Sequence, residues 1–182
     1  MKTLLLGMGN PILSDDSVGI RLATDVAGRL EGTPGLDVVA ECSAGGLELL
    51  DVLESYERLI VLDSIRTSGG APGDWYMLTA GSLKETIHLS NVHDVNFATA
   101  LEFGRRMGMP LPPDEEIRIF AVEVENNNTF GEALSARLAA AYPRILDEIY
   151  AGVLRSVEAA ADATPRTPST GTEGTRNSGS GT

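Results

Sequence analysis

The sequence of 182 residues contains a single cysteine, Cys42, so a chain cannot form an internal disulfide. No second Cys or His stands near Cys42 at the spacing of a zinc finger. A disulfide-rich secreted scaffold and a structural zinc site are therefore excluded. A reducing compartment is expected, because thiols persist there.

Basic side chains are also scarce, with 14 Lys and Arg against 26 Asp and Glu and a formal net charge of −12. Affinity for nucleic acids comes mainly from clustered Lys and Arg that release counterions from phosphates. The sequence shows no such cluster, and we therefore expect no nucleic-acid partner.

Long apolar runs are missing as well. No segment approaches the roughly 18 consecutive apolar residues of a membrane span. The apolar stretch near Met1 is shorter than the ~7–15 apolar residues of a signal peptide. We therefore expect a cytoplasmic protein without a membrane partner. Because a chain of about 150 residues can bury about 70% of its surface, no partner subunit is needed for a core, and a monomer is expected.

Residues 164–182 contain Thr, Pro, Ser, Gly, Arg, Glu and Asn but no hydrophobic residue. Such a segment cannot bury enough apolar surface to offset the entropy lost on ordering. We therefore predict one folded domain at residues 1–157 and a disordered tail, rich in Thr, Ser, Gly and Pro, at residues 158–182.

Within the folded part, short apolar runs alternate with longer segments of helical period. Expected strands lie at residues 3–6, 36–40, 59–62, 75–78 and 117–124, and expected helices at 16–30, 47–53, about 91–108 and about 130–154. The last helix is expected to begin at a capping box in which Thr129 is the N-cap and Glu132 stands three residues later. The alternation predicts an α/β fold, a three-layer sandwich with a twisted, mostly parallel sheet of about five strands and helices on both faces.

Three segments at strand ends or helix starts carry residues suited to chemistry. In open α/β sheets, ligands bind beyond the carboxyl ends of the strands. Asp15 and Asp16 lie in the loop after the first expected strand, and Asp63 directly follows the third. His93 stands at an expected helix start, whereas His88 has no helix-start signal beside it.

Each of these residues also has a structural interpretation. Asp15 can cap the helix expected at residues 16–30, and Asp63 can form a turn. Cys42 is expected to be a buried thiol rather than a nucleophile, because no base stands near it in the sequence. Two carboxylates and one imidazole from separate loops nevertheless form a donor set suited to zinc, nickel or manganese.

The first loop argues against a nucleotide-binding domain. Gly7 and Gly9 begin like a dinucleotide fingerprint, but Ile12 stands where the third glycine should be. Asp15 and Asp16 would also repel a pyrophosphate. We therefore expect no nucleotide or organic cofactor. The absence of His-Glu-x-x-His and Gly-x-Ser-x-Gly motifs disfavours a conventional zinc protease and a serine nucleophile.

The chain resembles the nickel-iron hydrogenase maturation endopeptidases, which remove the C-terminal extension of a hydrogenase large subunit. The resemblance covers nearly all of residues 1–155. The segments that carry it are Leu5-Leu6-Gly7-Met8-Gly9-Asn10-Pro11-Ile12-Leu13-Ser14-Asp15-Asp16, Ser43-Ala44-Gly45-Gly46-Leu47-Glu48-Leu49-Leu50, Leu59-Ile60-Val61-Leu62-Asp63, and His93 ahead of a helix.

This resemblance implies that Asp16, Asp63 and His93 contact a metal, and that the metal is nickel already installed in the substrate. It implies a cytoplasmic peptidase, aspartic-type or metal-assisted, with Asp16 and Asp63 as catalytic residues and the large-subunit precursor as partner. Either the metal polarises the scissile carbonyl or activates water, or a carboxylate is the general base while the metal identifies a mature substrate. The alternative function is a non-catalytic metal-sensing binding module or chaperone for the large subunit.

Overall fold

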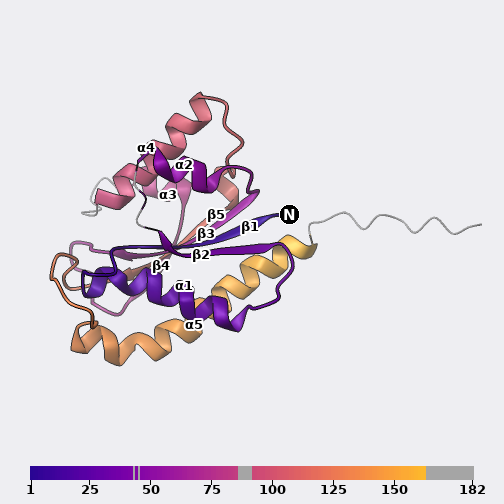
Figure 1. Ribbon diagram of the computed structural model, residues 1–182. Helices are drawn as coiled ribbons and strands as arrows, with labels where there is room; N and C mark the ends of the chain where they lie inside the picture. The colour runs from indigo at the N-terminus through magenta and orange to yellow at the C-terminus, as the bar shows by residue number, and fades with distance from the viewer. Residues whose placement is uncertain (43, 45, 86–91, 163–182) are drawn as a thin grey trace, which may run out of the picture.

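The computed structural model describes residues 1–42, 44, 46–85 and 92–162 (Figure 1). Its strands are β1 (Thr3–Met8), β2 (Leu36–Cys42), β3 (Arg58–Ile65), β4 (Trp75–Thr79) and β5 (Ile117–Glu123). Its α-helices are α1 (Val18–Arg29), α2 (Glu48–Leu53), α3 (Ala80–Glu85), α4 (Val92–Arg106) and α5 (Ala136–Asp162), and its 3-10 turns are η1 (Asp15–Ser17) and η2 (Asp114–Glu116).

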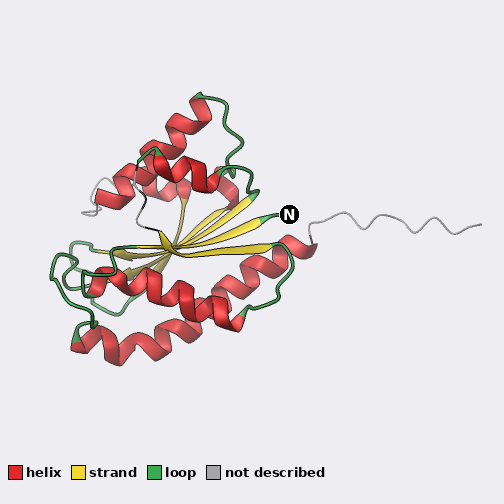
Figure 2. Ribbon diagram, viewed as in Figure 1, coloured by secondary structure: helices red, strands yellow, loops and turns green. Residues whose placement is uncertain are grey.

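The five strands form one sheet in the order β2-β1-β3-β5-β4, in which β4 alone pairs antiparallel to its neighbour. Helices α1 and α5 cover one face and α2, α3 and α4 cover the other, so the molecule has three layers (Figures 1 and 2). The predicted fold class is confirmed.

Side chains alternate between two apolar clusters, one on each face of the sheet. Leu5 of β1 and Ile60 of β3 pack into the first cluster, beneath α1 and α5. Their neighbours Leu4 and Leu59 pack into the second, beneath α2 and α4. Successive residues of a strand point to opposite faces, and both faces of this sheet are covered, which explains why its central strands are apolar throughout.

The chain reverses its direction of winding between β1 and β3. From β1 it passes to β2 on one side, and β3 then returns to the other side of β1. Such a switch point leaves a crevice at the carboxyl ends of the two central strands, which is where ligands bind in open α/β sheets. The loop that carries Asp16 and the end of β3 that carries Asp63 meet at this point.

Three predictions about the elements were wrong. The last helix begins at Ala136 rather than near Phe130, because the preceding segment pairs with the loop after β1. Helix α3 was not expected, so five α-helices are described where four were predicted. The predicted domain boundary at residue 157 lies inside α5, which continues to Asp162. Residues 163–182 lie outside the described part.

Among the described residues, no helix combines the length and the apolar character needed to cross a membrane.

Candidate functional site

Asp16 lies in η1, between the loop that follows β1 and the start of α1, and its side chain is buried. The backbone N–H of Asn10 donates a hydrogen bond of 2.9 Å to Asp16 Oδ2. Gly9 has a φ of +137°, and a Cβ there would lie 2.1 Å from the carbonyl oxygen of Asp16. Glycine thus lets the loop fold back closely over Asp16, which fixes the position of its carboxylate.

Asp63 is also buried, and it lies inside β3 rather than directly after it as expected. Its Oδ1 accepts a hydrogen bond of 2.7 Å from the backbone N–H of Ser64. The hydroxyl of Ser64 donates a hydrogen bond of 2.8 Å to Asp16 Oδ1. Ser64 therefore hydrogen-bonds to both predicted carboxylates, to Asp16 through its hydroxyl and to Asp63 through its backbone N–H.

Helix α1 packs closely on the two central strands. A Cβ at Gly19 would lie 2.4 Å from the carbonyl oxygens of both Met8 and Leu62, and 2.9 Å from the Cα of Asp63. Any side chain larger than hydrogen would push α1 away from the carboxyl ends of β1 and β3. Gly19 therefore lets the start of α1, which directly follows the turn that carries Asp16, pack against the backbone of Asp63.

Two buried carboxylates held in this way suit two kinds of chemistry. Each ionised carboxylate oxygen has more than one lone-pair direction, so a hydrogen bond to Ser64 or Asn10 leaves acceptor capacity. Such oxygens can bind a divalent ion or take a proton from water. Among the described residues, no group of three or more His, Cys, Asp and Glu side chains has a metal-binding arrangement. The carboxylate pair alone does not complete a metal site.

His93 is the second residue of α4, which agrees with the predicted helix start. Its side chain lies outside what the structure describes, so the predicted approach of His93 to the two carboxylates stays a prediction. His88 also lies outside the described residues.

Asp15 has a role that sequence reasoning misassigned. It makes no side-chain cap to the helix that follows it. Its Oδ1 instead accepts a hydrogen bond of 2.7 Å from the backbone N–H of Ser135, whose carbonyl accepts the N–H of Ala139 in α5. Asp15 therefore supports the start of α5, 120 residues away in the chain.

Glu123 is a buried acidic residue that sequence reasoning missed. It ends β5 and accepts hydrogen bonds from Thr67, at 2.7 Å from the backbone N–H and 2.8 Å from the hydroxyl. A Cβ at Gly70 would lie 2.2 Å from its carboxylate, so the loop after β3 wraps closely around Glu123. An acidic residue at the end of an apolar strand was the available signal, the same one that identified Asp63.

Cys42 ends β2 and is buried, as predicted. Burial raises the pKa of its thiol, which keeps the sulfur protonated at neutral pH and unsuited to nucleophilic attack. This agrees with a packing role.

Two large apolar side chains are exposed on paired loops, one in the loop after β1 and one ahead of α5. Ile12 is 58% exposed and Phe130 is 77% exposed. Their loops are joined by a β-bridge between Leu13 and Phe130, with hydrogen bonds from Ser14 N–H to the Thr129 carbonyl and from Gly131 N–H to the Ile12 carbonyl. We call Ile12 and Phe130 the apolar rim.

Comparison with known proteins gives a family match across most of the chain. Residues 20–151 match the model of the hydrogenase maturation protease family, a range that includes Asp63 and His93 and begins just after Asp16. The hydrogenase 2 maturation protease of Escherichia coli K12 is 31% identical over 78 residues. That alignment covers 43% of this chain and 47% of the relative, about half the length of each.

Solved structures share the fold. The hydrogenase maturating endopeptidase HybD from E. coli aligns with a TM-score of 0.70 at 23% identity, over 86% of this chain and 94% of that chain. The [NiFe] hydrogenase maturation protease HybD from Thermococcus kodakarensis aligns with a TM-score of 0.62 at 19% identity, over 84% of this chain and 99% of that chain. At these identities the likeness establishes the architecture.

Proposed function

The chain belongs to the hydrogenase maturation protease family, and from this premise we propose that it removes the C-terminal extension of a nickel-iron hydrogenase large subunit after nickel insertion. The observation that carries the proposal is the family match over residues 20–151. A protease is a hydrolase, and its partner here is the large-subunit precursor. The alternative of a non-catalytic metal-sensing module is not favoured, because the matched family is one of proteases.

We assign the catalytic roles to Asp16 and Asp63, and contact with the nickel of the precursor to these two residues and His93. Carboxylate oxygens and imidazole nitrogens are ligands that nickel accepts. The nickel enters with the substrate rather than as a cofactor of the protease. Support comes from the burial of both aspartates and from the hydrogen bonds that orient them.

Peptide hydrolysis needs a group that takes a proton from water as the water oxygen attacks the scissile carbonyl. One carboxylate of the pair accepts that proton and then delivers it to the departing amine, so the C–N bond breaks without a charged nitrogen leaving. When nickel is bound, it supplies electrophilic polarisation in the metal-assisted form of the reaction. Asn10 and Ser64 hold Asp16 in one orientation throughout.

The surface around the pair fits a polypeptide substrate. The exposed side chains of Ile12 and Phe130, on the loop that leads to Asp16 and the segment paired with it, offer apolar contact area to a protein. We propose that the enzyme works as a cytoplasmic monomer. The support for this is its acidic composition, its single buried cysteine and a core large enough for one chain.

Three substitutions test the site, Asp16→Asn, Asp63→Asn and His93→Ala. Each is expected to abolish nickel-dependent shortening of the precursor, because each removes a charge or a ligand, and the two Asn variants also keep the size of Asp. Shortening is followed over time with nickel-loaded and nickel-free large subunit, and a melting curve is recorded for each variant. A melting temperature close to that of the unmodified protein shows that the loss is chemical.

The control is His88→Ala, which is expected to process precursor normally. Near-normal cleavage by any one of the three site variants removes that residue from the site. A nickel-loaded precursor that binds the unmodified protein but is never shortened would overturn the protease function in favour of the metal-sensing module.

A further inference from the structure

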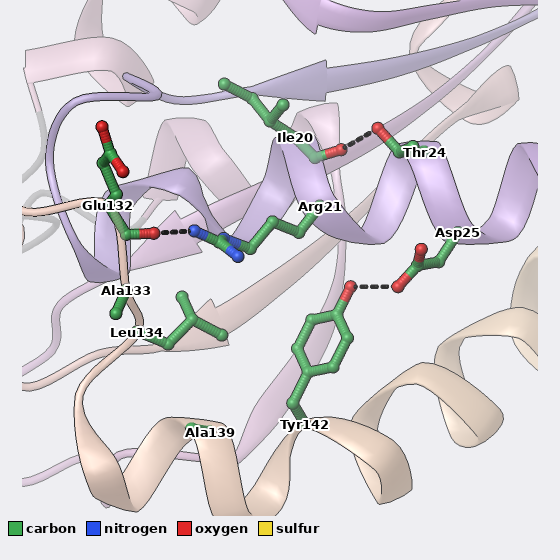
Figure 3. A pocket seen from close by; sticks show the side chains of 9 residues that line it. All are labelled: Ile20, Arg21, Thr24, Asp25, Glu132, Ala133, Leu134, Ala139 and Tyr142. Carbon is green, nitrogen blue, oxygen red and sulfur yellow. Dashed lines mark hydrogen bonds between the residues drawn. The ribbon is translucent and has the colours of Figure 1, made fainter.

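A cavity of about 530 Å³ lies between α1 and the segment that leads into α5 (Figure 3). Residues of α1 form one wall, and residues 132–134 with the first turns of α5 form the other. We call it the α1–α5 pocket. Its volume lies within the range of small-ligand and side-chain binding pockets. Nothing in the proposed reaction uses it.

Arg21 is the basic residue in the lining of this pocket, which also includes the acidic residues Asp25 and Glu132. Its Nε–H donates a hydrogen bond of 2.9 Å to the hydroxyl of Ser17, and its Nη2 donates to the carbonyl oxygen of Glu132. Figure 3 shows the Glu132 carboxylate turned away from the guanidinium. Within the described part of the chain, Arg21 forms no ion pair, although the protein carries a net charge of −12. A guanidinium with donors to spare is the group best matched to a carboxylate.

The remaining walls define what else the ligand must carry. Ile20, Leu134 and Ala139 give the pocket an apolar lining next to Arg21. At the far side, the hydroxyl of Tyr142 donates a hydrogen bond of 2.8 Å to Asp25 Oδ2, as Figure 3 shows. Burial raises the pKa of Tyr142, so the hydroxyl stays protonated and this bond persists at neutral pH. A carboxylate accompanied by an apolar group is therefore complementary to the pocket.

The pocket is tied to the carboxylate site. Arg21 lies five residues after Asp16, which corresponds to roughly 8 Å along a helix axis. The hydroxyl of Ser14 donates a hydrogen bond of 2.6 Å to the carbonyl of Ala133, in the pocket wall. An extended chain covers roughly 3.3 Å per residue, so two or three residues of a bound polypeptide span the distance.

We propose that the α1–α5 pocket is a docking site for an acidic side chain, flanked by an apolar one, on the large-subunit precursor. This inference rests on the proposed function for the identity of the polypeptide. The occupant follows from charge complementarity at Arg21, from the apolar walls, and from the short path to Asp16. The pocket holds a passing segment of the substrate while the scissile bond reaches the carboxylates.

Binding of nickel-free precursor tests the docking site without requiring cleavage. The variants are Arg21→Gln, which removes the charge, and Ala139→Trp, which fills the cavity without removing a side-chain hydrogen bond. Matched controls are Arg29→Gln, on the same helix but paired with Asp147, and Ala140→Trp, at the neighbouring exposed position. Each Kd is measured by biolayer interferometry, and each melting temperature is recorded.

Both pocket variants are expected to raise Kd at least tenfold with an unchanged melting temperature, and to raise KM for nickel-loaded precursor with little change in kcat. The controls are expected to stay within twofold of the unmodified protein. Replacing each Asp and Glu of the precursor near the cleavage site in turn identifies the partner of Arg21. The precursor variant that lacks this partner binds the unmodified protein more weakly. Its binding to the Arg21→Gln variant is no weaker than that of the unmodified precursor.

A Kd within twofold for both Arg21→Gln and Ala139→Trp overturns the docking site. If the unmodified protein cuts precursor and both pocket variants bind it normally, the docking site fails and the proposed function stands. If the binding pattern holds but no precursor is ever shortened, the proposed function fails alone. Precursor that neither binds nor is cut contradicts both.

Discussion

Ser64 donates hydrogen bonds to both aspartates of the candidate site, one from its hydroxyl and one from its backbone N–H. Its hydroxyl donates to Asp16 and its backbone N–H donates to Asp63, and all three residues are buried. Hydrogen bonds to a charged group are stronger than neutral ones, and losing one inside the protein leaves an acceptor without its donor. The orientation of the Asp16 carboxylate therefore depends on this hydroxyl.

We expect Ser64→Ala to lower the free energy of unfolding by about 1–3 kcal/mol, the cost of leaving a buried polar partner unsatisfied. Precursor cleavage should slow at least tenfold, because Asp16 loses the bond that fixes its orientation. Urea denaturation and the rate of precursor shortening are the two measurements.

The control for this prediction is Ser156→Ala. Ser156 donates its hydroxyl to the Gly152 carbonyl within α5, away from the site, so its loss should leave the cleavage rate unchanged. Equal rates for Ser64→Ala and the unmodified protein would show that Asp16 needs no such bond.

How far the site could be predicted differs from residue to residue. Asp16 and Asp63 were identifiable because each follows an apolar run in the sequence, and parallel strands deliver their carboxyl ends to one edge. Ser64 gave no signal, since a serine beside an aspartate is common in turns. Glu123 carried the same signal as Asp63 but was not considered. The placement of the His93 side chain stays a prediction.

At the scale of elements, the start of α5 is set by a distant carboxylate. Asp15 accepts the N–H of Ser135, and α5 begins at the next residue. An acidic group at a helix N-terminus stabilises it by satisfying a free N–H and by interacting with the helix dipole. The site loop and α5 are therefore coupled through Asp15.

We expect Asp15→Ala to lower the free energy of unfolding by about 0.5–2 kcal/mol, the usual cost of losing a helix cap. Asp15→Asn should lose less, because the amide oxygen can still accept the Ser135 N–H. Urea denaturation of both variants measures the difference.

A comparison variant, Thr129→Ala, separates this arrangement from the capping box predicted at Thr129. The structure gives Thr129 an exposed position before α5, so its loss should change stability by less than about 0.5 kcal/mol. A larger loss for Thr129→Ala than for Asp15→Ala would mean that the helix begins where the sequence suggested.

The errors in the predicted helices have separate physical causes. The capping-box pattern near Thr129 is a local signal, whereas the backbone hydrogen bonds that hold this segment come from the loop after β1. Helix propensity is weak, so these tertiary hydrogen bonds determine the conformation of the segment near Thr129 in place of the local helix preference. Helix α3 is only six residues long and directly follows β4, too short for a clear helical period.

For the whole molecule, the order of apolar runs was sufficient to predict the architecture. Both faces of the sheet are covered, so its central strands are largely apolar, a pattern that is typical of parallel strands joined by helical crossovers. The residue at which the folded domain ends was harder to predict from the sequence. Val153 and Val157 are buried in the first apolar cluster, yet they lie in the last part of a largely alanine-rich and charged helix.

Two truncations test where the folded molecule ends. Removing residues 163–182 should leave the melting temperature and precursor cleavage unchanged, because residues 164–182 contain no hydrophobic side chain with which to pack.

Removing residues 152–182 also deletes Val153 and Val157, and each buried valine contributes about 1.5–3 kcal/mol. It further deletes the Ser156 carbonyl that accepts a hydrogen bond from buried Arg58. Since a domain is stable by only about 5–15 kcal/mol, this truncation should unfold at a much lower temperature and lose cleavage with it. A large drop in melting temperature for the shorter deletion would show that residues 163–182 pack on the domain, and equal stability for the longer one would mean that the end of α5 contributes nothing to the core.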